Sequence, residues 1–242
     1  MYSFGIYDSG IGGLTTLVAL KKAFPNCDFC FLADTKNNPL GTKKPLEIAT
    51  AVNEGLEYLR AMSHIQVIAC NTASTVAKPR GAYLLQPYLD DLSPSNTLLL
   101  STPATARALN LGELGYPTAD TNNLATAVEI LGETAFKERD INVFNRIEST
   151  IKSIVENAIK GQEIDTIYLG CSHYNYFKKS LKKLFPTIKI IDGNDRLISS
   201  ISKENLTKGG NETAFDFTLG NQQAKYKWLV DMFEENEGFQ GI

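Results

Sequence analysis

The sequence is poor in the residues that define several classes of protein. Its 242 residues contain only two histidines and four cysteines, and the single C-x-x-C pair has no second such pair to complete a zinc site. No apolar run reaches the roughly 18 residues of a membrane-spanning helix. The 24 Lys and Arg residues are scattered, and a formal net charge of -3 gives no basic footprint for a nucleic acid. We therefore expect no metal, no membrane and no nucleic acid among its partners.

The N-terminus also lacks the charged segment that opens a secretory signal peptide. Its first ten residues, MYSFGIYDSG, are typical of a strand instead. We therefore expect a cytoplasmic protein, in which the four cysteines stay reduced. A chain of this length, 43% hydrophobic and 21% charged, can bury a core as one large or two medium α/β domains.

Two similar stretches carry the most chemical information. They are VIACNTAS at residues 67–74 and TIYLGCSHY at residues 166–174. Each is an apolar run of strand length that ends in a small residue, a cysteine and polar side chains, as where a strand meets a helix. Ligands of open α/β sheets bind at the carboxyl ends of the strands. Cys70 alone could be a small buried hydrophobic residue, but its counterpart Cys171 favours two thiols that flank one substrate as acid and base.

The N-terminal segment predicts a strand at Tyr2–Tyr7, a glycine-rich loop at 8–13 and a helix at Leu14–Phe24. Glycines let backbone N–H groups approach a ligand, so this loop could cradle an anion at the start of the helix. Its spacing does not match G-x-G-x-x-G, which disfavours a dinucleotide. Asp8 ends the strand and is a candidate functional carboxylate, with a turn or helix-capping role as the alternative.

Cys27 and Cys30 have C-x-x-C spacing, but they lie in an apolar run, Cys27–Ala33, that predicts the second strand. Without further ligands, packing in that strand is the better interpretation. A composition rich in Asp, Ser, Pro and Asn marks residues 89–96 as the crossing between domains. Local pattern predicts further helices at Pro45–Ser63, Ser74–Tyr83, Ala135–Arg139, Ile141–Lys160, Arg196–Asn205 and Ala224–Glu235, and a last strand at Phe215–Leu219.

Four motifs in order give the chain a family resemblance over nearly its whole length. They are DSGIGG at 8–13, DT at 34–35 followed by PLG at 39–41, ACNTAS at 69–74, and GCSHY at 170–174. Together they resemble the glutamate racemases of the cofactor-independent aspartate/glutamate racemase superfamily. The resemblance implies two similar α/β domains with mostly parallel sheets, related by pseudo-twofold symmetry, and an active site in the cleft between them. The first domain would comprise residues 1–95 and 209–242, and the second residues 96–208.

In that family two cysteines act on opposite faces of the substrate Cα, one removing a proton and the other supplying one. The resemblance assigns the D-isomer to Cys70 and the L-isomer to Cys171. Asp8 would assist Cys70, His173 would assist Cys171, and Glu129 would support His173. Loop amides and hydroxyls would bind the substrate at Ser9, Pro39, Leu40, Gly41, Asn71, Thr72 and Ser172. The superfamily uses no metal, pyridoxal or nucleotide cofactor.

The resemblance further implies an isomerase whose small-molecule substrate is glutamate. It would supply D-glutamate for peptidoglycan, and a homodimer is compatible with this assignment. Leu40 stands where the family usually carries tyrosine, and Ser172 where it usually carries threonine. The loss of the phenol motivates one alternative, a racemase for aspartate or another acidic amino acid. A second alternative, from a different class, is a catalytically silent amino-acid-binding protein, against which the presence of both cysteines and His173 argues.

The chemistry of thiols sets what their neighbours must do. A free thiol has a pKa of about 8.5 and is only partly ionised at neutral pH, so proton abstraction requires tuning. His173 can accept the Cys171 proton, or stabilise the thiolate as a cation. An anionic Asp8 would hold Cys70 protonated as the acid, unless Asp8 itself accepts the proton. We therefore expect the two thiols to be tuned differently.

Overall fold

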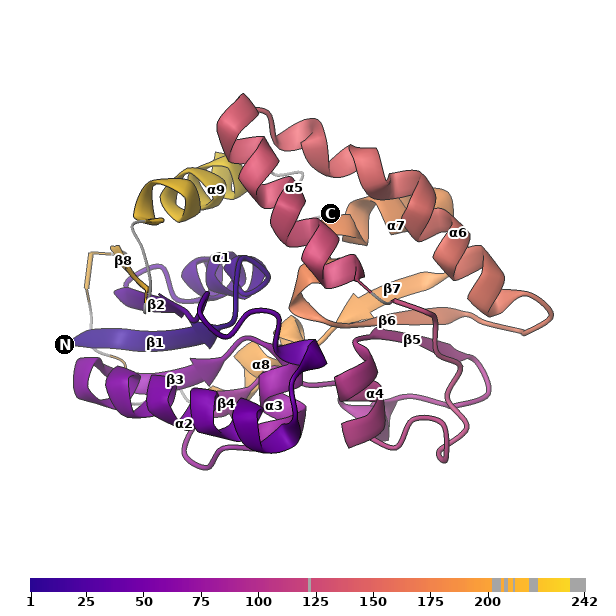
Figure 1. The fold of residues 1–242 in the computed structure, drawn as a ribbon, viewed down its shortest axis with the longest axis horizontal. Coiled ribbons are helices and arrows are strands. Elements are labelled where there is room, and N and C mark those ends of the chain that lie inside the picture. The colour runs from indigo at the N-terminus through magenta and orange to yellow at the C-terminus, as the bar shows by residue number, and fades with distance from the viewer. Residues whose placement is uncertain (122, 202–205, 207–208, 211, 218–221, 236–242) are drawn as a thin grey trace.

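A computed structural model gives the fold and describes residues 1–121, 123–201, 206, 209–210, 212–217 and 222–235 (Figure 1). The strands are β1 (Tyr2–Asp8), β2 (Phe29–Ala33), β3 (Ser63–Ile68), β4 (Tyr83–Leu84), β5 (Thr97–Ser101), β6 (Thr166–Gly170), β7 (Lys189–Asp192) and β8 (Thr213–Phe217). The α-helices are α1 (Leu14–Ala23), α2 (Pro45–Met62), α3 (Asn71–Ala77), α4 (Pro103–Ala108), α5 (Leu124–Glu138), α6 (Glu148–Ile159), α7 (Lys178–Leu184), α8 (Asn194–Ser200) and α9 (Gln223–Glu235). Shorter 3₁₀ helices lie at Leu40–Thr42, Leu89–Asp91, Ile141–Ile147 and Ser172–Phe177.

The strands form two parallel sheets. The first has the order β4-β3-β1-β2-β8, and the second has the order β5-β6-β7. Every strand pair in the described part of the chain is parallel, with registers such as Phe4 opposite Phe29 and Leu98 opposite Ile167. The predicted α/β fold with parallel sheets is confirmed.

The C-terminal part of the chain returns to the first sheet. β8 pairs with β2, and α9 packs against α1 and α5. β8 overlaps the predicted strand Phe215–Leu219, of which residues 218 and 219 lie outside the described residues, as do residues 202–205 of the predicted helix Arg196–Asn205. Residues 211, 220–221 and 236–242 of the segment 209–242 also lie outside them. The assignment of 209–242 to the first domain and the boundary at 95/96 stay predictions.

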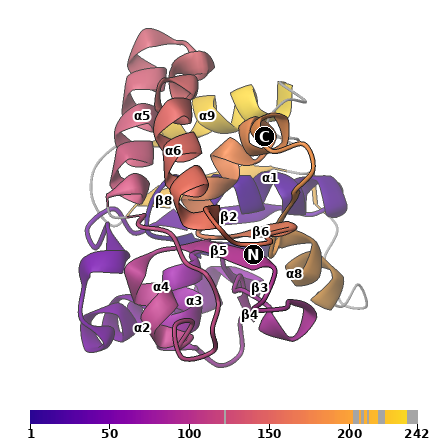
Figure 2. The same cartoon turned by 90° about the vertical axis from the view of Figure 1, so that its right-hand side faces the viewer.

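Side chains alternate between the two faces of the first sheet, as the period of a strand requires. Phe4 and Ile6 of β1 belong to one core cluster, and Tyr7 to another. The first cluster includes the buried Leu14 and Leu17 of α1, and the second includes the buried face of α2. Figures 1 and 2 show the resulting layers, with α5, α6 and α9 on one side of the sheets and α2, α3 and α4 on the other.

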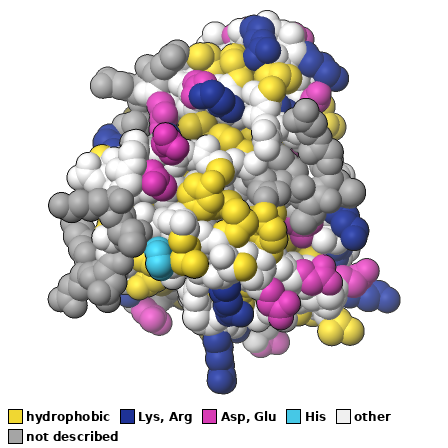
Figure 3. Space-filling model, turned by 90° about the vertical axis from the view of Figure 1, so that its left-hand side faces the viewer, with side chains coloured by type: hydrophobic (Ala, Val, Ile, Leu, Met, Phe, Trp, Pro, Cys, Tyr) yellow, Lys and Arg dark blue, Asp and Glu magenta, His cyan; other side chains and the backbone are white. Residues whose placement is uncertain are grey.

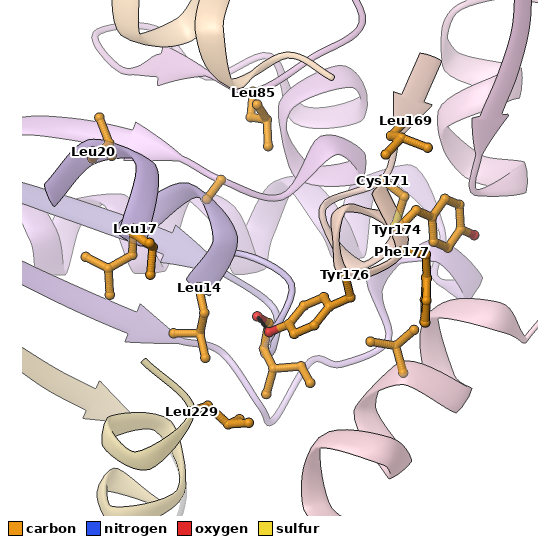
Figure 4. Close-up of a cluster of buried hydrophobic side chains, with 14 of the residues drawn as sticks. Leu14, Leu17, Leu20, Leu85, Leu169, Cys171, Tyr174, Tyr176, Phe177 and Leu229 are labelled. Carbon is orange, nitrogen blue, oxygen red and sulfur yellow. Dashed lines mark hydrogen bonds between the residues drawn. The ribbon is translucent and has the colours of Figure 1, made fainter. Parts of the chain in front are cut away.

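The larger core cluster joins the two halves of the molecule. It combines side chains of the first sheet with Leu98 of β5 and Ile167 of β6. Figure 4 shows part of this cluster, where Tyr176 lies near Leu14 of α1. The Tyr176 hydroxyl donates a hydrogen bond to the carbonyl of Ile11 at 2.7 Å. Apolar burial and this hydrogen bond therefore hold the loop before α1 against the 3₁₀ helix that follows β6.

The predicted helix Ser74–Tyr83 is wrong at both ends. The observed helix α3 begins three residues earlier and ends at Ala77, because Lys78 adopts a left-handed φ of 45° and Pro79 follows it. Proline offers no N–H to a helix and disfavours helical backbone in the residue before it. Tyr83 belongs instead to β4, which pairs with β3 at the edge of the sheet. The helix after the first cysteine is therefore short.

A second error concerns the helix that carries Glu129. The sequence predicts a helix only from Ala135, whereas α5 runs without interruption from Leu124 to Glu138. Gly132 lowers the helix propensity of this segment. A Cβ at that position would lie 2.4 Å from Cδ1 of Ile11, so the glycine permits close packing on the N-terminal loop. Tertiary packing thus overrides the local preference.

On the face in Figure 3, basic and acidic side chains are interspersed around a group of hydrophobic side chains. Within the described ranges, no helix is both long and apolar enough to cross a bilayer. His64 lies exposed in β3, so His173 is the one buried histidine of the chain.

Candidate active site

The two cysteines meet at one cavity. Cys70 follows β3 and Cys171 follows β6, and both line a cavity of about 280 Å³. Each cysteine is 5% exposed, and both are free thiols. A water molecule takes up about 30 Å³ of the liquid, so the cavity is large enough for a small metabolite. The two thiols therefore reach one small space from strand ends in different sheets.

His173 connects Cys171 to a carboxylate on α5. Its Nδ1 atom lies 3.8 Å from Cys171 Sγ, and its Nε2 atom lies 2.7 Å from Glu129 Oε1. The backbone N–H of Ile11 donates to the same Glu129 oxygen at 2.8 Å. Because the carboxylate accepts the Nε2 proton, the Nδ1 atom is left facing the sulfur. Glu129 therefore sets the orientation of the imidazole.

The same contacts set the charge of His173. Burial disfavours the cation, but hydrogen bonds to Cys171 and Glu129 outweigh burial and raise the pKa of His173 well above its usual value. These contacts therefore favour the imidazolium form, which lies between a carboxylate and a sulfur. The sequence leaves two roles open for His173, and the cation that stabilises a thiolate fits this geometry better.

The surroundings of Cys70 favour a neutral thiol. Burial raises the pKa of Cys70, the Asp8 carboxylate raises it further, and the backbone N–H of Ala73 offsets only part of this. Ser9 Oγ lies 3.9 Å from Cys70 Sγ. A cation thus lies beside Cys171, whereas an anion acts on Cys70.

Asp8 is fully buried and links the two halves of the molecule at the site. Its Oδ1 atom accepts the N–H of Gly10 at 2.8 Å, and its Oδ2 atom accepts the hydroxyl of Ser172 at 3.1 Å. Burial raises the pKa of Asp8 to about 6, and the His173 cation is the largest opposing effect. The carboxylate is therefore mostly ionised at pH 7. Asp8 is a turn residue through Gly10 and a member of the site at the same time.

The backbone N–H groups of the glycine-rich loop bind carboxylates, and these carboxylates are side chains of the protein itself. The N–H of Gly10 is taken by Asp8, and the N–H of Ile11 is taken by Glu129. The anion cradle that the sequence predicts for a ligand is therefore occupied in part by these two carboxylates. In this way the loop orients groups around the cavity.

Gly12 in the same loop is required for a different reason. A Cβ there would lie 2.4 Å from Ser172 Oγ and 2.7 Å from His173 Nδ1. Only a residue without a side chain lets the loop approach these groups so closely.

All predicted substrate-binding residues line the cavity: Ser9, Pro39, Leu40, Gly41, Asn71, Thr72 and Ser172. Among them Asn71 is unusual, because both polar atoms of its side-chain amide are buried and find no hydrogen-bond partner in the described part of the chain. Buried polar groups are rarely left unpaired, so a ligand in the cavity is the natural partner. Leu40, in contrast, is 1% exposed and belongs to the core cluster on the α2 side of the first sheet.

The cavity also includes residues that the sequence does not predict, among them Thr102, Arg107 and Thr121. Thr102 follows β5 as Cys70 follows β3, and its hydroxyl lies 2.9 Å from that of Thr72. Its position at the end of a strand is a feature of the sequence that could have identified it as a site residue. Arg107 lies on α4 and reaches the cavity because α4 packs against the 3₁₀ helix Leu40–Thr42. No local pattern predicts that contact.

The remaining cysteines fit the packing interpretation. Cys27 and Cys30 are unbridged and buried, and they belong to the two core clusters of the first sheet. In the part of the chain that the structure describes, no group of three His, Cys, Asp or Glu residues could hold a metal ion.

Comparison with known proteins shows to which family the chain belongs. No family model matches the chain. The glutamate racemase of Campylobacter concisus is 34% identical to it over 230 residues, covering 84% of this chain and 86% of that protein. A glutamate racemase isoform of Bacillus anthracis has the same fold, with a TM-score of 0.73 at 21% identity over 96% of this chain and 93% of that chain. The glutamate racemase of Francisella tularensis, solved in complex with D-glutamate, aligns with a TM-score of 0.67 at 20% identity over 97% of this chain and 94% of that chain. The solved structures share the fold, and the identity and coverage of the Campylobacter protein show that this chain belongs to the glutamate racemase family.

Proposed function

We propose that the protein interconverts L- and D-glutamate, with Cys171 and Cys70 acting on opposite faces of the substrate Cα. One observation carries the proposal: two thiols line one small cavity, with an imidazole beside Cys171 and the Asp8 carboxylate acting on Cys70. Membership of the family and the D-glutamate bound to the Francisella protein support glutamate as the substrate.

The reaction of L-glutamate starts with Cys171 as the thiolate beside the His173 cation, and with Cys70 as the thiol. The Cα proton moves to Cys171 Sγ, and the electron pair stays on Cα and its carboxylate. Cys70 then gives its proton to the opposite face of Cα, which produces D-glutamate. One proton leaves the substrate and one enters it, so the balance closes. The reverse reaction starts from the Cys70 thiolate and the Cys171 thiol.

The cavity also offers groups that lower the energy of the carbanion. The amide of Asn71 has no hydrogen-bond partner among the residues that the structure describes and can donate to the substrate carboxylate, where negative charge increases in the transition state. The His173 cation adds electrostatic stabilisation from the side of Cys171. Both groups are buried, so little water screens them.

Family membership supports a cellular role as well. We place the protein in the cytoplasm, as a source of D-glutamate for peptidoglycan and hence for cell-wall biogenesis and cell shape. The homodimer stays a prediction, which light scattering coupled to size-exclusion chromatography tests directly.

The proposal is tested by incubating the enzyme with L-glutamate, D-glutamate and L-aspartate in D₂O. Circular dichroism follows inversion, and proton NMR follows deuterium at Cα. Cys70→Ser and Cys171→Ser should each lower racemisation by roughly 10²-fold or more, the usual contribution of an acid or base. Cys27→Ala removes a buried thiol outside the cavity and serves as the control, with activity near that of the wild type.

The variants also test which face each thiol serves. Cys70→Ser keeps the Cys171 base, so it should still exchange the Cα proton of L-glutamate while forming little D-glutamate. Cys171→Ser should show the opposite preference. Racemisation at the wild-type rate in both variants would rule out the two-thiol mechanism, and faster inversion of L-aspartate than of glutamate would reassign the substrate.

A further inference from the structure

The cavity includes one permanently cationic side chain that the mechanism above does not use, that of Arg107. It is the fifth residue of α4 and lines the cavity together with Thr102 and Pro103. The residue is exposed, so it lies where the cavity meets solvent. α4 packs against α3 and against the 3₁₀ helix Leu40–Thr42. The backbone that carries Arg107 is therefore held in place by elements of the other half.

Arg107 is available to a ligand. Among the residues that the structure describes, no Asp or Glu forms an ion pair with it. Within the same residues, no second Lys or Arg lines the cavity. A guanidinium presents five N–H donors in a planar fork that matches a carboxylate.

The ionisable side chains around the cavity carry a net negative charge, which disfavours an anionic substrate. Asp8 and Glu129 contribute two carboxylates and His173 contributes one cation, which leaves a net charge of -1 before either thiol ionises. A dicarboxylic amino acid also carries a net charge of -1 at neutral pH. Like charges repel most strongly where little water screens them. A further cation at the cavity offsets this repulsion and so favours binding of a dicarboxylic amino acid.

The positions of the other polar groups indicate which carboxylate Arg107 binds. Asn71 and Ser172 directly follow the two cysteines, so they lie beside the point where Cα must sit. Residues 39–41 are Pro, Leu and Gly and offer no polar side chain, and Leu40 is buried in the core. The far end of the substrate therefore finds its charged partner in Arg107.

We propose that Arg107 is a specificity-determining residue that forms a forked ion pair with the side-chain carboxylate of the substrate. This inference rests on the proposed function, since it assumes an acidic amino acid in the cavity. It accounts for selection against the neutral amide of the same length, because glutamine would leave the guanidinium without an anionic partner.

Three variants test the pair. Arg107→Gln removes the charge, Arg107→Lys keeps the charge without the fork, and Arg80→Gln removes an exposed arginine that does not line the cavity. For each protein, calorimetry gives the Kd of glutamate, and steady-state kinetics give kcat and KM for L- and D-glutamate. L- and D-glutamine are measured as competitive inhibitors. The melting temperature is recorded alongside, so that loss of structure is recognised.

Arg107→Gln should raise the Kd and KM of glutamate by roughly tenfold, with kcat reduced less than threefold, because the pair binds the part of the substrate that does not react. The inhibition constant of glutamine should change less than twofold. Arg107→Lys should fall between the wild type and Arg107→Gln, and Arg80→Gln should match the wild type.

The inference is overturned if Arg107→Gln and Arg80→Gln bind glutamate equally, or if Arg107→Gln weakens glutamate and glutamine by the same factor. Because binding is measured apart from turnover, the two proposals fail separately. A wild-type protein that binds glutamate through Arg107 without exchanging its Cα proton would refute the racemisation and keep the ion pair.

Discussion

Replacing Glu129 by glutamine is the sharpest test of how the Cys171 side of the site is charged. The Glu129 carboxylate lies 2.7 Å from His173 Nε2, and the two side chains are only 19% and 5% exposed. Glutamine keeps the size of the side chain and one acceptor oxygen, so the N–H of Ile11 still finds its partner. The substitution therefore removes mainly one negative charge.

The magnitude follows from that geometry. Two full charges 2.7 Å apart attract by about 6 kcal/mol at an effective dielectric constant of 20, and the cost of desolvating both cancels much of this. A hydrogen bond to a charged group contributes about 1.5–3 kcal/mol net. One pKa unit corresponds to about 1.4 kcal/mol, so the pKa of His173 should fall by about 1–2 units in Glu129→Gln.

The pKa of His173 can be followed by NMR without ambiguity, because the chain has only two histidines. The imidazole signals of His64 and His173 can be titrated by NMR, and the exposed His64 serves as the internal control that should give the same curve in both proteins. In the enzyme assay, the alkaline limb of the pH profile of kcat/KM should move to lower pH with the imidazolium. Since the equilibrium constant of a racemisation is one, kcat/KM must fall equally in both directions.

The raised pKa of His173 also makes the free energy of unfolding depend on pH in one direction. The folded-state pKa of His173 is raised, so its contribution is complete below the unfolded-state pKa of about 6.5 and is lost as the pH rises through the folded value. Glu129→Gln should therefore cost about 2 kcal/mol of unfolding free energy at pH 6 and less at high pH. An unchanged His173 titration, with an alkaline limb within about 0.3 pH units of the wild type, would refute the assignment of Glu129.

Three further predictions concern stability and activity together. Asp8→Asn should raise the unfolding free energy at pH 7–8 by up to about 3 kcal/mol, because the rise of the pKa from 3.8 to about 6 destabilises the ionised form. That gain should vanish as the pH falls from 6 towards 4 in urea titrations, while racemisation decreases at pH 8. Gly12→Ala should cost about 1–3 kcal/mol in denaturant unfolding and most of the activity, since its Cβ would overlap Ser172 and His173; unchanged values would contradict the close approach. Asn71→Ala should leave the melting temperature within about 2 °C, because the buried amide loses no hydrogen-bond partner within the described ranges, yet lower kcat/KM at least tenfold; equal kcat/KM would remove Asn71 from the site.

Much of the fold and the identity of the reactive groups follow from local sequence. Apolar runs that stop at Cys70 and Cys171 predict strand ends, and the carboxyl ends of parallel strands are where ligands bind. The observed β3 and β6 end just before these residues. Asp8 ends β1 and His173 lies shortly after β6, whereas their roles beside the two cysteines come from the family resemblance of the motifs that contain them.

The parts that local sequence misses depend on contacts distant in the chain. Glu129 lies on a helix whose propensity is interrupted by Gly132, and that glycine is explained only by its contact with Ile11. Arg107 has no motif, because it reaches the cavity through the packing of α4 on the other half.

By itself, the sequence determined where strands and helices begin and end in most places, and which polar residues follow the strands, because hydrophobic periodicity and turn chemistry act over a few residues. Only the tertiary structure decided that Cys70 and Cys171 share one cavity and that the glycine loop holds two protein carboxylates. It also decided that burial raises the pKa of Asp8 and that hydrogen bonds to Cys171 and Glu129 raise the pKa of His173. Those properties depend on contacts between segments distant in the sequence, such as Asp8 and Ser172, which are 164 residues apart, and on the exclusion of water. Both arise only when the halves pack.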